Sequence, residues 1–441
     1  MKTPQLGLRE NWHQFALLVL INAFVGGMVG LERSILPRLA EQEFHLVARS
    51  AILSFIVVFG LTKAVANYYA GAWANRVGRK NLLLLGWLFG LPVPLLLLWA
   101  PSWGWVIAAN VLLGLNQGLA WSSTVVMKID LVGPKQRGLA MGLNESAGYL
   151  AVAATAFASG WLATEYGLRP YPFYLGIVLA VLGLLGSLLV RDTRHHVALE
   201  AAQAPSAPAG PPLSFWDVSW RHPNLGSVTQ AGLVNNLNDG MVWGLLPLLL
   251  ASKGFTLTQI GTVAAVYPAV WGLGQLVTGP LADRLCKKDL MFGGMLLQGA
   301  VLLAMLFADG YPAFLGLAAL LGAGTALVYP TFLAAVAEYA PLPQRAHSVG
   351  IFRFWRDAGY AIGALLTGVL ADAFGLETAL ATIGGLTVLS ALVIKQRMYC
   401  LPVLDNEASP ARNCPRPTPA RSGGTNRATG SSLLGGLIFA G

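Results

Sequence analysis

Ionisable side chains interrupt several otherwise apolar stretches of this sequence, where they could bind a charged group or exchange a proton. Arg353 and Asp357 are four residues apart, so on a helix they share one face and are predicted to form an ion pair. Arg356 then needs a partner on another segment, for which Asp239 is the first candidate and Glu145 the second. Such residues within a membrane helix usually face its neighbours, pair, or mark a substrate or proton pathway. A permanent interhelical salt bridge is the structural alternative.

Amide side chains gather just before Asp239. Asn235 and Asn238, together with Gln230 and Asn236, cover too wide an arc of a helix to face lipid alone. A single buried amide usually joins neighbouring helices by hydrogen bonds, but this concentration beside an acid predicts a polar cavity. The predicted substrate-binding and ion-binding residues are therefore Glu145, Asn235, Asn238, Asp239, Arg353, Arg356 and Asp357.

The sequence lacks the motifs of common catalytic and ATP-driven proteins. It contains no G-x-x-x-x-G-K-[ST] loop, no H-E-x-x-H motif and no G-x-S-x-G turn. We therefore expect neither an enzyme nor an ATP-driven pump, and no cofactor. The three cysteines, Cys286, Cys400 and Cys414, are odd in number and widely spaced, which predicts neither a disulfide framework nor a metal site.

The composition places the charged residues in a membrane protein. Of the 441 residues, 55% are hydrophobic and only 11% are charged, whereas soluble domains carry about 25% charged residues. A helix needs about 20 mainly apolar residues to cross the hydrocarbon core of a bilayer. We predict an all-α membrane protein with twelve transmembrane helices, over residues 15–36, 51–74, 82–100, 103–127, 138–163, 171–190, 225–251, 258–282, 290–308, 311–336, 346–371 and 377–395.

The twelve predicted helices form two sets of six that repeat one another. A constant offset of 208 residues aligns the following pairs: Gly71 and Gly279, Arg76 and Arg284, Gly114 and Gly322, Arg137 and Arg345, Gly142 and Gly350, Gly160 and Gly368. Parallel repeats of this kind occur in transporters that bind substrate between the repeats. We predict two pseudo-symmetric six-helix bundles, over 1–190 and 223–398, an irregular Pro/Ala-rich cytoplasmic linker over 191–222, and a disordered cytoplasmic tail over 399–441.

The distribution of Lys and Arg predicts the orientation. With both termini in the cytoplasm, 21 of the 29 basic residues lie on the cytoplasmic side and only four on the other, as the positive-inside rule requires. The net charge of +9 is dispersed over short loops rather than clustered on one domain, which argues against a nucleic-acid partner. We expect a multi-pass protein of the cytoplasmic (inner) membrane, in contact with the lipid bilayer and monomeric.

A basic motif occurs at the same place in both sets, between the second and third helices. Its glycines, polar or acidic residue and basic residues are Gly71, Asn75, Arg76, Gly78, Arg79 and Lys80 in the first set, and Gly279, Asp283, Arg284 and Lys288 in the second. With twelve helices in a six-plus-six repeat, this G-x-x-x-D-R-x-G-R-K box resembles the major facilitator superfamily over about residues 10–398. The resemblance implies its two-bundle fold and a gating role for the box residues.

The sequence departs from the drug and proton antiporters of that superfamily. The acid of the first box is replaced by Asn75, so the contact usually made there is expected to depend more on Asp283. Asn110 stands where those antiporters usually have an arginine, four residues before Gly114, and their Gly-Pro signature is not clear in 138–163. These departures concern the subclass and leave the transporter fold unaffected.

The leading functional interpretation is a secondary active transporter that moves a small-molecule substrate by alternating access between the two bundles. Proton-coupled efflux is favoured on the resemblance, with Glu145, Asp239 or Asp357 as the carboxylate that takes the coupling proton. The first alternative is proton-coupled uptake or facilitated diffusion of an organic anion, suggested by Arg353 and Arg356. The second is a membrane receptor or scaffold that transports nothing.

Overall fold

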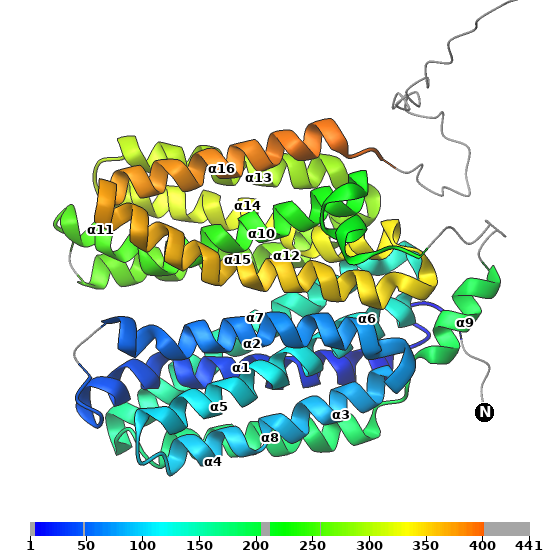
Figure 1. The fold of residues 1–441 in the computed structure, drawn as a ribbon, viewed down its shortest axis with the longest axis horizontal. Helices are drawn as coiled ribbons and strands as arrows, with labels where there is room; N and C mark the ends of the chain where they lie inside the picture. The colour runs from blue at the N-terminus through cyan, green and yellow to red at the C-terminus, as the bar shows by residue number, and fades with distance from the viewer. Residues whose placement is uncertain (1–4, 47–48, 204–211, 256, 401–441) are drawn as a thin grey trace, which may run out of the picture. The chain divides into compact units, whose positions relative to one another are not determined.

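The computed structural model describes residues 5–46, 49–203, 212–255 and 257–400, and every regular element in these ranges is a helix (Figure 1). Helical backbone suits so apolar a sequence, because a helix satisfies its own backbone hydrogen bonds where no water is present. The first helix set comprises α1 (Trp12–Gln42), α2 (Arg49–Val77), α3 (Arg79–Gly90), α4 (Pro92–Leu98), α5 (Trp103–Asn116), the π-helix η1 (Gln117–Trp121), α6 (Ser122–Val132), the 3₁₀ turn η2 (Pro134–Gln136), α7 (Arg137–Tyr166) and α8 (Tyr171–Leu189).

The second helix set follows the linker. It comprises α10 (Pro223–Gly244), α11 (Leu246–Ser252), α12 (Leu257–Arg284), α13 (Lys287–Ala304), the 3₁₀ turns η4 (Met305–Phe307) and η5 (Leu342–Gln344), α14 (Tyr311–Tyr339), α15 (Arg345–Phe374) and α16 (Leu376–Arg397). Pro268 and Pro280 lie inside α12, and Pro330 lies inside α14. Each removes one backbone hydrogen bond from its helix.

All twelve predicted ranges are mainly helical where the structure describes them. Within these residues, nine helical segments are long and apolar enough to cross a membrane. The ranges 103–127, 225–251 and 258–282 are not among the nine; η1 interrupts the first, and the break between α10 and α11 at Leu245 interrupts the second. The count of twelve spans therefore remains a prediction.

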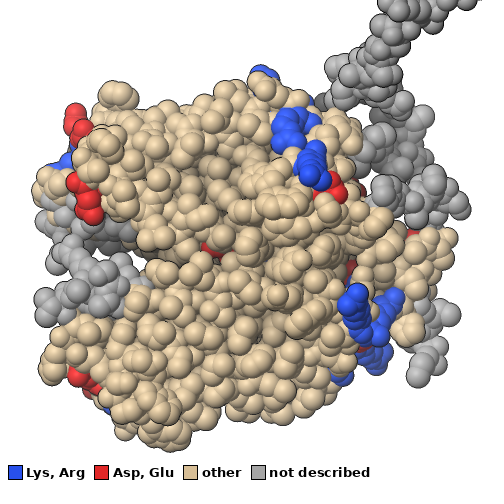
Figure 2. All heavy atoms as spheres, in the orientation of Figure 1, with Lys and Arg blue, Asp and Glu red and all other residues tan. Residues whose placement is uncertain are grey.

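The outer surface has the polarity expected of helices in lipid. Large apolar side chains are exposed along their length, including Leu61, Phe157, Val277 and Leu365. On the face shown in Figure 2, charged side chains gather near the two ends of the helices and the belt between them is almost free of Lys, Arg, Asp and Glu. Lipid contact favours such a belt, because a charge there would have no water to solvate it.

The two helix sets meet chiefly where α2 packs along α15 and α7 packs along α12, and α7 also contacts α14. These contacts lie toward one end of the helices, which carries the loops at residues 133–136, 285–286 and 341–344. The helix α9 (Arg194–Gln203) also lies at this end. We call it the linker face.

The predicted irregular linker contains regular structure, so that prediction was wrong for part of its length. Residues 194–203 form α9, and Asp217–Arg221 form the π-helix η3. The sequence of α9 is free of Pro and Gly and rich in Ala, with Leu, Glu and Gln, which favours a helix. The Pro-rich stretch 204–211 and the predicted tail after Cys400 lie outside the described residues.

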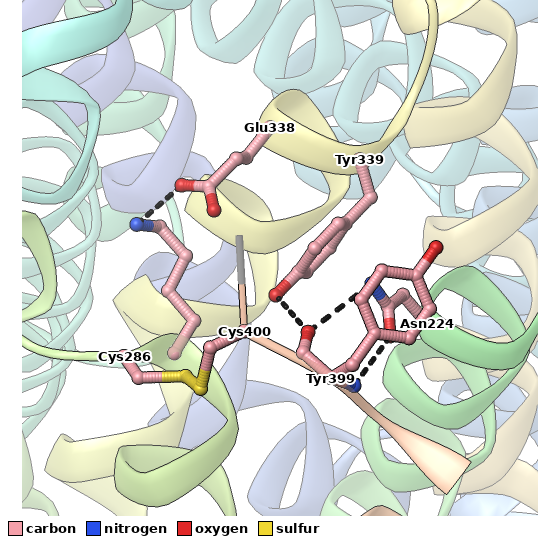
Figure 3. Close-up of a disulfide and its surroundings, with 7 residues drawn as sticks. Asn224, Cys286, Glu338, Tyr339, Tyr399 and Cys400 are labelled. Carbon is pink, nitrogen blue, oxygen red and sulfur yellow. Dashed lines mark hydrogen bonds and ion pairs between the residues drawn. A yellow bond between two sulfur atoms is a disulfide. The ribbon is translucent and has the colours of Figure 1, made fainter. Parts of the chain in front are cut away.

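The expectation of no disulfide was also wrong. Cys286, at the start of α13, is bonded to Cys400, 114 residues later (Figure 3). After α16 the chain returns to the α12–α13 loop. The Tyr399 backbone N–H donates to the Asn224 side chain at 3.0 Å, and its carbonyl accepts from the Asn224 amide at 3.3 Å and from the Tyr339 hydroxyl at 3.1 Å. Sequence spacing could not show this, because the helix packing alone brings the two cysteines together.

Candidate functional site

Asp357, on α15, is the centre of a buried cluster of charges. Its carboxylate accepts hydrogen bonds from Arg356, at 3.2 and 3.3 Å, and from the amide of Asn67 on α2. The Lys63 ammonium, also on α2, lies 3.9 Å away. The structure thus joins Asp357 to its neighbour in sequence and to the other helix set, rather than to Arg353 as the four-residue spacing predicted.

Arg353 is buried with no hydrogen-bond partner among the described residues. Its side chain is fully inaccessible, and none of its three guanidinium nitrogens makes a hydrogen bond. The guanidinium lies 5.9 Å from the centre of the Trp121 ring, a distance at which a cation interacts favourably with an aromatic face. A buried guanidinium without an acceptor is costly, so this position is suited to receive an anionic group.

Glu145, on α7, approaches the same tryptophan from another side. Its Oε1 accepts hydrogen bonds from the Asn144 amide at 2.7 Å and from the Trp121 indole at 3.2 Å. Its Oε2 is buried and has no hydrogen-bond partner in the part of the chain that the structure describes. One oxygen is therefore held in place while the other is free to carry a proton.

The structure adds Lys128, which the sequence placed in a cytoplasmic loop. It lies instead within α6, where its side chain is fully buried and its ammonium donates to the Asn144 side chain. Asn144 thus links Lys128 to Glu145. The sequence carries no clear signal for this buried position, because a lysine near a helix end usually reaches the aqueous interface.

Aromatic side chains from both helix sets surround these charges. The Tyr149 and Tyr329 hydroxyls lie 2.5 Å apart, and Trp271 packs against both rings with centroid distances of 4.3 and 4.8 Å. The Arg356 guanidinium lies 5.1 Å from the Tyr329 ring centre. The cluster can offer flat apolar surfaces beside its charged groups, a combination that suits a small amphipathic molecule.

The predicted residues of α10 divide into two groups. Asp239 accepts a hydrogen bond from the Tyr267 hydroxyl of α12. Asn235 is fully buried, and neither of its amide atoms has a hydrogen-bond partner among the residues described. Asn238 points elsewhere: it donates to Gln298 at 3.1 Å and accepts from Thr387 at 2.7 Å. Asn238 therefore joins α10 to α13 and α16, which favours a structural role.

The ionised forms of these side chains leave the cluster with an excess of positive charge. Four can be cations and three can be anions, so four minus three leaves one positive charge; the residues are Lys63, Lys128, Arg353, Arg356, Glu145, Asp239 and Asp357. An excess charge in a poorly solvated site attracts the opposite charge. The cluster as described is thus electrostatically suited to one further anion.

The cluster occupies repeat-equivalent positions of the two sets. The 208-residue offset relates the pairs Lys63 and Trp271, Trp121 and Tyr329, Glu145 and Arg353, and Tyr149 and Asp357. Each helix set places a side chain at the same four points but with different chemistry. The result is an asymmetric site built on a symmetric frame.

The box residues make a second constellation, at the linker face. Gly71 of α2 lies against Gly350 of α15, so closely that a Cβ added to Gly71 would come within 2.6 Å of the Gly350 Cα. In the equivalent place, a Cβ on Gly279 of α12 would come within 3.0 Å of the Gly142 Cα of α7. A void beside the first contact, lined by Ala70, Gly71 and Gly350 among others, measures about 10 Å³, enough for about one water molecule. The linker face is closed in this conformation.

The polar residues of the two boxes complete these contacts differently. Asp283 accepts hydrogen bonds from the backbone N–H groups of Gly138 at 2.6 Å and Leu139 at 2.8 Å. These N–H groups lie in the first turn of α7, where a helix offers them no acceptor of its own. Asn75 instead donates to the Pro343 carbonyl at 2.6 Å, just before α15. The expected dependence on Asp283 agrees with this geometry, because its contact uses a negative charge at the positive end of a helix.

The basic residues of the boxes have unequal roles. Arg79 bonds to Asp130 at 3.2 Å, and the equivalent Lys287 pairs with Glu338 at 2.5 Å. Lys80 donates to the Leu188 carbonyl at 2.9 Å. Gly78 begins α3 with a φ of 96°, a conformation that favours glycine. The other predicted gating residues, Arg76, Arg284 and Lys288, lie at the surface, where they suit anionic lipid headgroups.

Replacing Asp283 with alanine is expected to weaken the closed linker face. The variant loses both hydrogen bonds to the first turn of α7, and a lost helix cap typically costs about 1 kcal/mol. Hydrogen exchange should therefore accelerate at the Gly138 and Leu139 amides. Asp289→Ala, at an exposed position on the same face, is the control; equal exchange in the two variants would contradict the role given to Asp283.

The fold and the two constellations define a polytopic helical membrane protein with a charged interior between two repeated helix sets. The family model of the Major Facilitator Superfamily matches residues 15–230 and 228–430. The chain therefore belongs to the Major Facilitator Superfamily and is a transporter, which confirms the predicted fold class and the prediction that it is not an enzyme.

Curated relatives cover nearly the whole chain. Multidrug resistance protein MdtG of Citrobacter koseri is 24% identical over 395 residues, which are 87% of this chain and 94% of the relative. MdtG of Salmonella arizonae is 24% identical over 397 residues, covering 87% and 95%. Among solved structures, the human organic anion transporter MFSD10 (TETRAN) superposes with a TM-score of 0.69 at 16% identity, covering 87% of this chain and 99% of that one. The last similarity shows the fold alone.

Proposed function

We propose that this transporter exports small organic molecules from the cytoplasm in exchange for protons. The observation that carries the proposal is Glu145, a fully buried carboxylate. One of its oxygens is held by Asn144 and Trp121, and the other has no hydrogen-bond partner within the described ranges. Such a group can take a proton without breaking the hydrogen bonds that orient it. The name of the MdtG relatives, multidrug resistance protein, supports export as the direction.

In this mechanism the proton and the substrate influence the same group of side chains. When the site opens to the outside, Glu145 takes a proton at Oε2, and the neighbouring cations Lys128 and Arg353 lose part of their compensating charge. When it opens to the cytoplasm, Glu145 releases the proton and substrate binds against Trp121 and Tyr329. Because the site binds either the proton or the substrate but not both, the inward movement of protons down their gradient drives the substrate outward.

In this proposal the linker face lies on the cytoplasmic side of a bacterial inner membrane, and both termini lie on that side. The positive-inside distribution of Lys and Arg supports this orientation. The Cys286–Cys400 bond is the exception at this face, since disulfides are uncommon in the cytosol. The orientation rests on basic residues spread over many loops, and this one pair of cysteines does not outweigh them.

A second candidate function is the transport of an organic anion, in either direction. It is favoured by Arg353, whose buried guanidinium has no hydrogen-bond acceptor among the described residues, and by the excess positive charge of the cluster. The structurally similar human MFSD10 is an organic anion transporter. In this reading the substrate supplies the missing acceptor and neutralises the site.

Flux into proteoliposomes under an imposed pH gradient tests both candidates. We expect proton-driven movement of at least one compound from a panel of lipophilic cations, neutral drugs and organic anions. If the substrate is an anion, Arg353→Gln should lower its flux about ten-fold, the typical loss for one charged hydrogen-bond partner, and Arg191→Gln at an exposed position should leave it unchanged. Specific ligand binding without flux in any direction would favour a receptor and overturn the proposal.

A further inference from the structure

Glu200, on the linker helix α9, binds an arginine of each helix set. Its carboxylate accepts two hydrogen bonds from Arg345, at 2.8 and 2.9 Å, and one from Arg137, at 2.5 Å. The Glu200 side chain is only 6% exposed, and the two arginines are 4% and 7% exposed. A bidentate guanidinium–carboxylate pair is among the strongest and most directional polar contacts.

The two arginines are equivalent positions of the repeat. Arg137 is the first residue of α7 and Arg345 is the first residue of α15, and the offset of 208 residues relates them. Both helices also carry the inter-set contacts at the linker face, through Gly142 and Gly350. A single acid from the linker therefore joins the ends of the two helices on which closure depends.

The linker helix is itself anchored on the first helix set. The Thr193 hydroxyl, next to the start of α9, donates to Asp130 at 2.8 Å. Asp192 accepts the Lys80 backbone N–H at 3.2 Å, and His196 bonds to Asn11 at 3.2 Å. Glu200 thus extends from a docked helix and reaches Arg345 across the boundary between the sets.

We propose that Glu200 is a positioning residue of the transport cycle: it holds the linker face closed by bridging Arg137 and Arg345, and it must release one of them whenever that face opens. We call these three residues the linker latch. The inference goes beyond the proposed function, because it assigns a conformational role to a segment that joins the helix sets and lies outside the proposed substrate site.

Charge explains why the bridge controls the conformation. Arg137 and Arg345 both bind Glu200 Oε1, so without the carboxylate the two guanidinium groups would repel. Asp130 lies 3.9 Å from Arg345 and offsets this repulsion only in part, because it is also paired with Arg79 at 3.2 Å. Burial acts to raise the pKa of Glu200, but the hydrogen bonds and charges of Arg345 and Arg137 outweigh it and lower the pKa. A lowered pKa means that the ionised bridge stabilises the closed face above the ordinary glutamate pKa and is lost only in acid. The linker latch is therefore intact at neutral pH.

Hydrogen exchange on the full chain in lipid nanodiscs tests the linker latch without any substrate. In Glu200→Gln we expect exchange at the first turns of α7 and α15 to rise about ten-fold, within the range of coupling energies in hydrogen-bonded charge networks. Adding Arg137→Gln to Glu200→Gln should bring exchange back toward the wild-type rate, because the repulsion disappears. Glu200→Asp, which is shorter by one methylene, should give an intermediate rate and guards against a variant that fails to fold.

Glu10→Gln, at an exposed acid on the same face, is the matched control and should change nothing. Faster exchange confined to α9, or no rescue by Arg137→Gln, would show that Glu200 only fastens the linker helix and would overturn the proposal. Because exchange is read without substrate or gradient, the linker latch can stand if the flux experiment fails. It can equally fail while proton-driven flux is present.

Discussion

Replacing Asp357 with asparagine lowers the free energy of unfolding by about 3 to 5 kcal/mol, the usual cost of removing one member of a buried ion pair. The carboxylate compensates two cations at once, Arg356 through two hydrogen bonds and Lys63 at 3.9 Å. An amide leaves both cations buried without a counter-charge. The measurement is thermal and denaturant unfolding of the purified protein in detergent, followed by circular dichroism.

Asp372→Asn supplies the control, since Asp372 lies on the same helix but is exposed. The electrostatic cause is checked by adding Lys63→Met to Asp357→Asn, which removes one of the uncompensated cations. We expect this second change to recover part of the lost stability. Asp357→Asn that unfolds like wild type would show that water or another group compensates the cations.

Replacing Glu145 with glutamine should abolish coupling while leaving the protein folded. Proton-driven flux is expected to fall about a hundred-fold, as it does in enzymes that lose a proton-transferring group. Glutamine keeps an oxygen for Asn144 and Trp121 but cannot take or release a proton at the other position. Exchange of labelled for unlabelled substrate across the membrane, which needs no net proton movement, should therefore persist.

Glu165→Gln is the matched control for this experiment. Glu165 lies near the other end of the same helix, α7, and is exposed. Undiminished proton-driven flux in Glu145→Gln would exclude Glu145 as the coupling residue and direct attention to Asp239. Loss of both coupled flux and exchange would indicate that Glu145 positions the substrate as well.

Much of the fold follows from the sequence for simple reasons. The hydrophobic runs give the helices, because bilayer thickness fixes a minimum length. The 208-residue offset predicted that Gly142 and Gly350 are equivalent. In the structure, these are residues at which α7 and α15 pack closely against helices of the other set. Interruptions such as η1 are harder to foresee, since a π-turn is a local adjustment to packing and leaves no clear sequence signal.

The partners inside the site were harder to predict. Helix geometry allowed Arg353 to meet Asp357, but side-chain conformations and the neighbouring α2 decided in favour of Arg356 and Lys63. Lys128 and Glu200 were missed because both were assigned to loops. For the box pairs a signal was present: the same offset relates Arg79 to Lys287 and Asp130 to Glu338, and the structure joins each set's own pair.

The constant offset also bears on how such a protein diverges. The two halves keep the same spacing between their paired interior positions. They differ instead in residue type at these positions, such as glutamate at 145 and arginine at 353, or tyrosine at 149 and aspartate at 357. Each interior position therefore has an equivalent position in the other half of the same chain, with which its side chain can be compared.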